Sequence, residues 1–216
     1  MVPQSVAQRV AQRSTPSFSI GRELKTELIR KSIHLLIATV PFFAAIFGAF
    51  PTMILLAVGT LVYTYAEVLR QRGGRIPIIS RVTELASRKR DLGHFVLGPV
   101  TLATGAMLAL MLYPEPAASI AIYALAFGDG VASLVGKLFG RIGIPLTRGK
   151  TVEGSLACVA AVFLTSYLSL APYGGAGSAP LVAAGTLAVI AGLVEAMPLD
   201  DADNLALPMV VGLSAY

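Results

Sequence analysis

The sequence predicts an all-α protein, a polytopic helical bundle that crosses a membrane several times. Of its 216 residues, 55% are hydrophobic and only 13% are charged, and the mean hydropathy is +0.74. A water-soluble domain of this length would expose too much apolar surface, so much of the chain is expected to face lipid. The 17 Lys and Arg residues are confined to three short segments, as is typical of a multi-pass membrane protein.

Six apolar runs are candidates for full spans, each of which needs about 20 apolar residues. They cover residues 33–50, 52–69, 95–113, 117–139, 154–171 and 181–197. A short seventh run, 205–216, would reach only about 18 Å as a helix, so it is either a half-span or an incomplete final helix. No repeat or linker interrupts 33–216. We therefore predict one transmembrane catalytic domain there, preceded by a cytoplasmic segment at 1–32.

The positive charges indicate the orientation of the bundle. Lys and Arg occur in segments 9–31, 70–90 and 137–150, which lie on one side when the six runs are threaded alternately. Cytoplasmic loops retain positive charge, so the amino terminus and an adjacent active site are predicted to face the cytoplasm. The membrane would be a bacterial inner membrane, or an organellar or endoplasmic reticulum membrane. Anionic lipid head groups account for the basic face, so no nucleic acid partner is expected, and a homo-oligomer is left open.

The residues before the first run do not resemble a cleavable secretory signal, since about thirty largely polar residues precede it. Their early arginines and serines also fit an organellar transit peptide, which is the alternative to a plain cytoplasmic tail. Cys158 is the only cysteine, which excludes an intrachain disulfide and a cysteine-based zinc site.

The first run begins with a polar face. Arg30, Lys31 and His34 occupy neighbouring positions on one side of a helix. His34 is either a general base or simply a polar residue at the membrane interface. Pro41 lacks a backbone N–H and is expected to kink this span. After the second run, the interleaved apolar and charged residues of 80–90 predict a short helix lying on the membrane plane.

The fourth run carries two stripes with a spacing of four residues. The small residues that would let another helix approach closely are Gly128, Ala132, Gly136 and Gly140. Each of these glycines is either a packing residue or part of a phosphate cradle. Asp129, Ser133 and Lys137 form the adjacent polar stripe. A charged group at membrane depth costs roughly 2.5–3.5 kcal/mol, so Asp129 is interpreted as a Mg²⁺ ligand, with a structural ion pair to Lys137 as the alternative.

The region after the fourth run places more charge on the same side. Glycines and a proline within 141–150 predict a loop. Thr151 is expected to cap the next helix, and Glu153 lies in its first turn, where a carboxylate suits the helix dipole. Glu153 is either that dipole partner or a metal-associated residue, with Lys150 contacting phosphates. The acidic run 200–204 is either a solvated loop or a second metal contact.

Four segments together resemble a membrane family of kinases that act on dolichol, phytol or diacylglycerol with CTP, related to the phosphatidate cytidylyltransferases. They are Arg30-Lys-Ser-Ile-His34, Phe127-Gly-Asp-Gly-Val-Ala132, Lys150-Thr-Val-Glu-Gly154 and Asp203-Asn-Leu-Ala-Leu-Pro208. They span most of the chain and stand in the family's order. The first segment favours the kinase branch, because the cytidylyltransferase branch usually lacks it.

The resemblance implies a Mg²⁺-dependent transfer of the γ-phosphoryl group of a nucleotide, commonly CTP, to the hydroxyl of a lipid alcohol. The catalytic residues that it implies are Asp129, Glu153, Lys150 and His34. The implied metal ligands are Asp129, Glu153 and Asp203. The implied nucleotide-binding residues are Lys137, Lys150, Thr151, Arg30, Lys31, Gly128 and Asn204.

Two other functions share some of these features. A cytidylyltransferase would use a similar metal site but would attack the α-phosphorus, release pyrophosphate and make a CDP-lipid. A channel or transporter would use intramembrane acids as an ion path, but here nearly every charge lies on the predicted cytoplasmic side. The sequence has no Gly-x-x-x-x-Gly-Lys-Ser/Thr motif, which excludes a Walker-type site.

Overall fold

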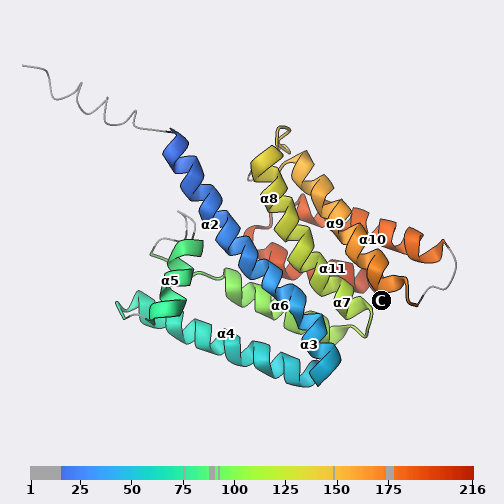
Figure 1. Cartoon of the computed structure of the whole chain (residues 1–216), viewed down its shortest axis with the longest axis horizontal. Coiled ribbons are helices and arrows are strands. Elements are labelled where there is room, and N and C mark those ends of the chain that lie inside the picture. Colours follow the sequence, from blue (N-terminus) through green and yellow to red (C-terminus); the bar gives the residue numbers. More distant parts are fainter. Residues whose placement is uncertain (1–15, 75, 88–90, 92, 148, 174–177) are drawn as a thin grey trace, which may run out of the picture.

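The computed structural model describes residues 16–216 apart from 75, 88–90, 92, 148 and 174–177. Within this part of the chain every regular element is a helix, as predicted (Figure 1). The elements are α2 (Pro16–Leu36), η1 (Ile37–Thr39), α3 (Val40–Phe47), α4 (Ala49–Gln71), α5 (Pro77–Ala86), α6 (Gly98–Leu112), α7 (Ala117–Tyr123), η3 (Ala124–Asp129), α8 (Gly130–Phe139), α9 (Val152–Leu170), α10 (Ala179–Glu195), η4 (Asp200–Ala202) and α11 (Asp203–Ala215).

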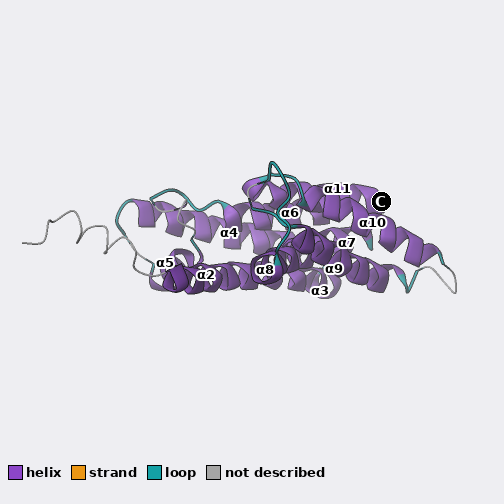
Figure 2. Cartoon of the chain, turned by 90° about the horizontal axis from the view of Figure 1, so that it is seen from above, coloured by secondary structure: helices purple, strands orange, loops and turns teal. Residues whose placement is uncertain are grey.

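The helices form two layers, which Figure 2 shows from above. One layer contains α2, α8 and α9, and in it α8 packs against both of its neighbours. The other layer contains α4, α6, α11 and α10, and in it α6 packs against α4 and α11. Contacts between α9 and α10 join the layers. Helix α7, which continues through η3 into α8, also packs against α11. Elements that are distant in the sequence are therefore brought together where the layers meet.

Four helical stretches are long and apolar enough to cross a membrane. They are Leu24–Phe47, Ala49–Gln71, Ala117–Phe139 and Val152–Leu170, and they correspond to the first, second, fourth and fifth predicted runs. Helices α6 and α10 are apolar but have only 15 and 17 residues, which is less than the roughly 20 residues of a full span. The six-span count and the cytoplasmic amino terminus therefore stay predictions. Helix α11, with 13 residues, takes the place of the short seventh run.

Two predicted segments differ in extent from the helices of the structure. The first apolar run was predicted at 33–50, and the first candidate span is Leu24–Phe47. Helix α2 runs through residues 32 and 33, where the division between a cytoplasmic segment and a membrane domain stays a prediction. The expected interfacial helix at 80–90 is α5, which begins earlier, at Pro77, and ends at Ala86. Residues 88–90, at the end of that prediction, lie outside the described part of the chain, as do Arg148 and residues 1–15.

The predicted break at Pro41 is confirmed. Helix α2 ends at Leu36, a 3₁₀ turn covers Ile37–Thr39, and α3 begins at Val40 with Pro41 in its first turn. Proline has no N–H to donate to the carbonyl four residues earlier, and its ring clashes with that carbonyl. The chain therefore cannot continue as an undisturbed α-helix through this point.

The most buried of the four candidate spans is Ala117–Phe139, which is formed by α7, η3 and α8. Its small-residue stripe packs against α9. A Cβ on Gly136 would lie 2.9 Å from Thr151 Oγ1, and a Cβ on Gly154 would lie 2.8 Å from the carbonyl oxygen of Ala132. Side chains at these positions would collide with the facing helix, so the predicted close-packing seam is confirmed.

Candidate active site

A cavity of about 430 Å³ lies where the ends of several helices meet. The first turns of α6, α9 and α11 and the last turns of α8 and α10 line it, together with one face of α2 and one of α5. The structure brings eight of the predicted site residues to this cavity. They are Arg30, His34, Asp129, Lys137, Lys150, Thr151, Asp203 and Asn204.

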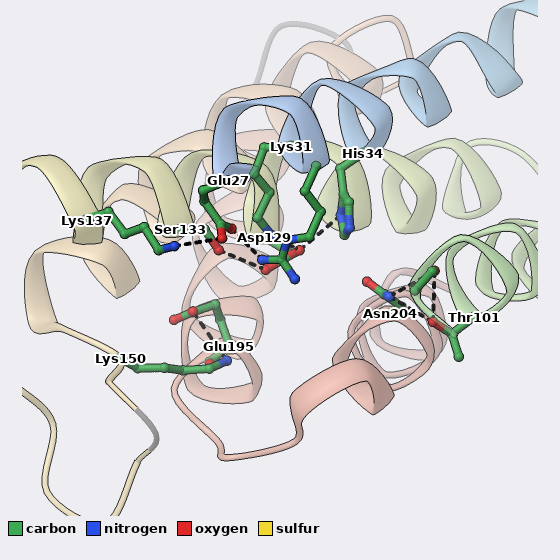
Figure 3. A network of polar contacts seen from close by, with 12 residues as sticks. Glu27, Lys31, His34, Thr101, Asp129, Ser133, Lys137, Lys150, Glu195 and Asn204 are labelled. Atoms are coloured by element: carbon green, nitrogen blue, oxygen red, sulfur yellow. Dashed lines mark hydrogen bonds and ion pairs between the residues drawn. The ribbon is translucent and has the colours of Figure 1, made fainter. Parts of the chain in front are cut away.

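Asp129 is the last residue of η3, a π-helical segment, and its side chain is buried. Such widened turns often occur at functional sites. Lys31 Nζ lies 2.5 Å from Asp129 Oδ2, and His34 Nδ1 lies 3.0 Å from the same oxygen (Figure 3). The histidine contact is close but is not aligned as a hydrogen bond. The sequence-based alternative, an ion pair with Lys137, is wrong, because Lys31 from α2 neutralises the carboxylate.

A second buried carboxylate, Glu27, was not among the predicted site residues. Lys137 Nζ donates to Glu27 Oε2 over 2.8 Å, and Arg30 forms an ion pair with the same side chain. Glu27 therefore links α2 to α8 beside the cavity and holds two cations there. Its signal in the sequence is spacing: Glu27 precedes Arg30 and Lys31 by three and four residues, which places it on the same helical face.

Lys150 enters the cavity from the loop before α9. The preceding Gly149 has φ of 85°, a conformation that residues with a side chain rarely adopt, so this turn requires glycine. Lys150 Nζ donates to the backbone carbonyl of Glu195 and lies 3.4 Å from Glu195 Oε1. Ser155 Oγ donates to Glu195 Oε2 over 2.7 Å. Glu195, at the end of α10, is thus a further cavity residue that sequence reasoning did not assign to the site.

The amino-terminal turn of α11 forms another part of the wall. Asn204 is buried, and its Nδ2 donates to Thr101 Oγ1 on α6 over 2.9 Å. Asp203 is partly buried beside it. Burial raises the pKa of the Asp203 carboxyl to about 6, and the negative charge of Asp129 adds to the shift.

Three of the predicted site residues do not line the cavity. Lys31 is 1% exposed, and its Nζ contacts the Asp129 carboxylate. Gly128 packs against α9, where an added Cβ would lie 3.0 Å from Val162 Cγ2. Glu153 turns towards the loop before its own helix. Its Oε1 accepts the backbone N–H of Arg141 over 2.9 Å, so it orders that loop.

Thr151 caps α9 as predicted, because the backbone N–H of Gly154 donates to Thr151 Oγ1 over 3.2 Å. The hydroxyl therefore serves the helix end, while the residue also lines the cavity. Together with the Glu153 contacts, this cap fixes the start of α9 and so the position of Lys150.

The predicted metal triad of Asp129, Glu153 and Asp203 is not assembled. Among the described residues, no three His, Cys, Asp or Glu side chains form a group that could hold a metal ion. Mg²⁺, however, is usually held by one or two carboxylates, with waters and substrate phosphates completing its shell. Asp203 offers a hard oxygen donor of this kind at the cavity wall, so its chemistry fits a Mg²⁺ ion that arrives with a nucleotide.

The remaining wall of the cavity is apolar. Its side chains come from α2, α5 and the start of α6, and they include Ile33, Ile78, Ile79, Val82, Leu97 and Leu102. The segment before α6 is held by α4: Tyr63 Oη donates to the Val96 carbonyl over 3.0 Å, and Glu67 Oε1 accepts the Val96 N–H over 3.0 Å. The cavity thus has a charged part and an apolar part.

The fold and the site define a helical protein with four candidate membrane spans and a cavity in which charged side chains adjoin an apolar wall. The chain is 30% identical to the phytol kinase of Synechocystis sp. over 160 residues, which are 74% of this chain and 67% of that protein. It belongs to the phytol kinase family.

Plant proteins are also similar to the chain. A probable chloroplastic phytol kinase 3 of Glycine max is 34% identical over 132 residues, or 57% of this chain and 41% of that protein. A chloroplastic farnesol kinase of Arabidopsis thaliana is 27% identical over 139 residues, or 60% of this chain and 45% of that protein. The chain thus spans less than half the length of these two plant relatives. No family model matches the chain. No solved structure matches it either.

Proposed function

We propose that the protein is a lipid-alcohol kinase that transfers the γ-phosphoryl group of a nucleotide, with CTP as the first candidate, to the hydroxyl of an isoprenoid alcohol. The observation that carries this proposal is a cavity in which cations and carboxylates adjoin an apolar wall. An enzyme that joins a phosphate to a lipid needs both surfaces next to one another. The names of the phytol and farnesol kinase relatives support an isoprenoid alcohol as the acceptor.

The phosphates of the nucleotide are assigned to Lys150, Lys137 and Arg30. All three line the cavity, and each is held by a carboxylate, Glu195 for the first and Glu27 for the other two. Phosphoryl transfer asks the protein chiefly to position the reactants and to neutralise charge, for which such fixed cations are suited. These pairs also orient the cations before the nucleotide arrives.

His34 is assigned the role of the general base, which takes up the proton of the alcohol hydroxyl. Its Nδ1 lies 3.0 Å from Asp129 Oδ2, and although the contact is not aligned as a hydrogen bond, the negative charge would favour a proton on Nδ1 and leave Nε2 as the acceptor. Asp129 would thus orient the base, and Lys31 would keep Asp129 ionised within the bundle. This is the usual division of roles between a histidine base and its carboxylate partner.

Mg²⁺ is proposed to bind at Asp203 together with phosphate oxygens of the nucleotide. The ion would supply charge neutralisation at the transferred phosphoryl group.

For the membrane arrangement, we propose that α6 and α10 also cross the membrane, which gives six spans. We further propose that the cavity faces the side of the membrane on which the Lys and Arg residues lie.

The test is a matrix of acceptors and nucleotides with the purified full chain in lipid nanodiscs. Farnesol, geranylgeraniol, phytol, a polyprenol and dioleoylglycerol are each combined with Mg²⁺ and γ-labelled CTP, UTP, ATP or GTP. We expect label to enter the organic phase with an isoprenoid alcohol. A parallel reaction contains phosphatidate as the acceptor. Its conversion to a CDP-lipid, with release of labelled pyrophosphate, would instead identify a cytidylyltransferase.

Matched lysine variants test whether this cavity is the site of the reaction. Lys150→Gln should raise the KM for the nucleotide by about tenfold, since one charge-assisted contact is worth roughly 1.5 kcal/mol. Lys25→Gln changes an exposed lysine of α2 that does not line the cavity and should leave the KM unchanged.

The proposed kinase function is refuted if, in the matrix of acceptors and nucleotides, no alcohol is phosphorylated with any nucleotide.

A further inference from the structure

The carboxamide of Asn204 has a defined orientation. Thr101 Oγ1 donates its single proton to a backbone carbonyl, that of Gly98, over 3.0 Å. The hydroxyl can then only accept from Asn204, so the Asn204 group that faces it over 2.9 Å is the Nδ2 amine. The carbonyl oxygen Oδ1 is consequently turned away from α6. Figure 3 shows Oδ1 on the side that faces Asp129 and His34.

This oxygen lacks a donor among the described residues, although Asn204 is only 3% exposed and lines the cavity. Buried carbonyl oxygens are nearly always hydrogen-bonded, because leaving one without a donor is costly. An unsatisfied acceptor in a cavity wall therefore indicates a ligand that brings a donor. The candidates are an alcohol O–H, an amino group of a nucleobase, or a cation.

The surroundings of Asn204 distinguish between these candidates. In Figure 3, Lys137 and Lys150 lie on one side of Asp129, while Asn204 and Thr101 lie on the other. Two of the three phosphate-binding cations, Lys137 and Lys150, thus lie across the central carboxylate from Asn204.

On the side of α6, the wall next to Asn204 is apolar. Thr101 precedes Leu102 on α6, and the apolar residues of α5 line the same cavity. A donor group attached to an apolar chain suits this part of the cavity better than a charged or highly polar one.

We propose that Asn204 Oδ1 accepts a hydrogen bond from the hydroxyl of the acceptor alcohol, and that the apolar faces of α5 and α6 hold its chain. This inference rests on the proposed kinase function and reassigns Asn204 from the nucleotide to the acceptor. The ligand class is an alcohol that carries a long apolar chain. Asn204 is a positioning residue, because an amide cannot take up the proton at neutral pH.

The hydrogen bond would hold the alcohol so that an oxygen lone pair faces the γ-phosphorus. The bond from the alcohol oxygen to the γ-phosphorus forms, and the bond from that phosphorus to the β–γ bridging oxygen breaks. The nucleoside diphosphate leaves with the electron pair. The hydroxyl has one proton, which turns from Asn204 Oδ1 to His34 Nε2 as the new bond forms and is taken up there. The products are a lipid monophosphate and a nucleoside diphosphate, so atoms and charge balance.

The first test separates the two substrates kinetically. Asn204→Leu removes the acceptor oxygen with little change in volume. We expect kcat/KM for farnesol or phytol to fall by about tenfold or more, while the KM for the nucleotide stays within about twofold. Thr101→Val, which removes the group that orients the amide, should shift the same parameter in the same direction by less. Unchanged nucleotide binding by each variant shows that it is folded.

The outcomes of this test are distinct. If the wild type phosphorylates an alcohol and Asn204→Leu leaves its kinetics for alcohols unchanged, the acceptor assignment is overturned while the kinase proposal stands. A rise confined to the KM for the nucleotide, or a change in nucleotide preference, would place Asn204 at the nucleobase and also overturn it. If no alcohol is phosphorylated by the wild type, the proposed function itself fails.

The second test concerns the chain of the alcohol and uses a matched pair on α5. Val82 and Leu85 are about equally exposed, at 41% and 43%, but only Val82 lines the cavity. Val82→Trp should lower kcat/KM for a 20-carbon alcohol relative to a 10-carbon alcohol by about tenfold, because one large side chain removes space along the chain. Leu85→Trp should leave this ratio unchanged. Equal ratios in the two variants would overturn the assignment of α5.

Discussion

The buried pair of Lys31 and Asp129 allows a catalytic role to be separated from a structural one. Asp129→Asn removes the carboxylate and leaves Lys31, which is 1% exposed, without its partner. Removing one member of a buried ion pair costs roughly 3–5 kcal/mol, because the other charge is left uncompensated. For a chain of this size 1 kcal/mol corresponds to about 2–4 °C in the unfolding midpoint. The single variant should therefore lose about 6–20 °C.

The double variant Lys31→Met/Asp129→Asn removes both charges and keeps similar volumes. Replacing a buried ion pair by neutral groups is often close to neutral in stability, so the midpoint should return to within about 4 °C of the wild type. Activity should not return. Without Asp129 the orientation of His34 is lost, and we expect phosphoryl transfer in both variants to be lower by about 10²–10⁴-fold.

The chain provides its own reporter for this experiment. Cys158 is the only cysteine and is 0% exposed, so a thiol-reactive fluorophore will label it as the protein unfolds. Midpoints are measured by this labelling in detergent, and activity by transfer of labelled phosphate to farnesol. Recovery of activity in the double variant would show that Asp129 acts only through stability. A wild-type midpoint for Asp129→Asn would refute the energetic reasoning about the buried pair.

Two further predictions use other features of the bundle. Gly154→Ala places a Cβ 2.8 Å from the Ala132 carbonyl oxygen, so it should lower the free energy of unfolding by about 1–3 kcal/mol. Gly185→Ala is the control, because a Cβ there has nothing within 4 Å and should not lower stability. Equal unfolding midpoints of the two variants in the thiol assay would contradict the close packing of α8 and α9. The Asp203 carboxyl has a raised pKa of about 6, so it is ionised above that pH and protonated below it. Activity at subsaturating Mg²⁺ should fall as the pH drops through about 6, and more Mg²⁺ should move this fall to lower pH. A fall that does not move with Mg²⁺ would argue against a metal at Asp203.

The features that the sequence predicted well are local ones. The fourth run was expected at 117–139, and the structure has Ala117–Phe139. The break before Pro41 and the cap at Thr151 depend on a few neighbouring residues, so their chemistry is visible without a partner. The close-packing stripe of glycines on α8 could likewise be predicted from their spacing of four residues alone. That the stripe packs against α9 is seen only in the structure.

The features that could not be predicted from the sequence depend on contacts between elements that are distant along the chain. Lys137 lies on the same helical stripe as Asp129, but Lys31, 98 residues away in the sequence, provides the partner. Glu27 gave a spacing signal, yet nothing in the sequence indicated that α2 would lie against α8. Glu153 shows the same difficulty, because a carboxylate in a first turn can face the cavity or its own preceding loop, and here it faces the loop.

The charges of the cavity make the nucleotide and the metal interdependent. Among the described lining residues, seven are carboxylic acids, while three are Lys or Arg, namely Arg30, Lys137 and Lys150. Each of these cations is already close to a carboxylate. A nucleoside triphosphate without a bound metal ion would therefore enter a cavity with an excess of negative charge, and electrostatic repulsion would oppose its binding. A divalent cation bound to the phosphates removes much of this repulsion and at the same time gives Asp203 a favourable partner. In the proposed enzyme, the acid-rich wall would thus favour the metal-bound nucleotide over the free one, and Mg²⁺ would take part in substrate recognition as well as in the chemistry.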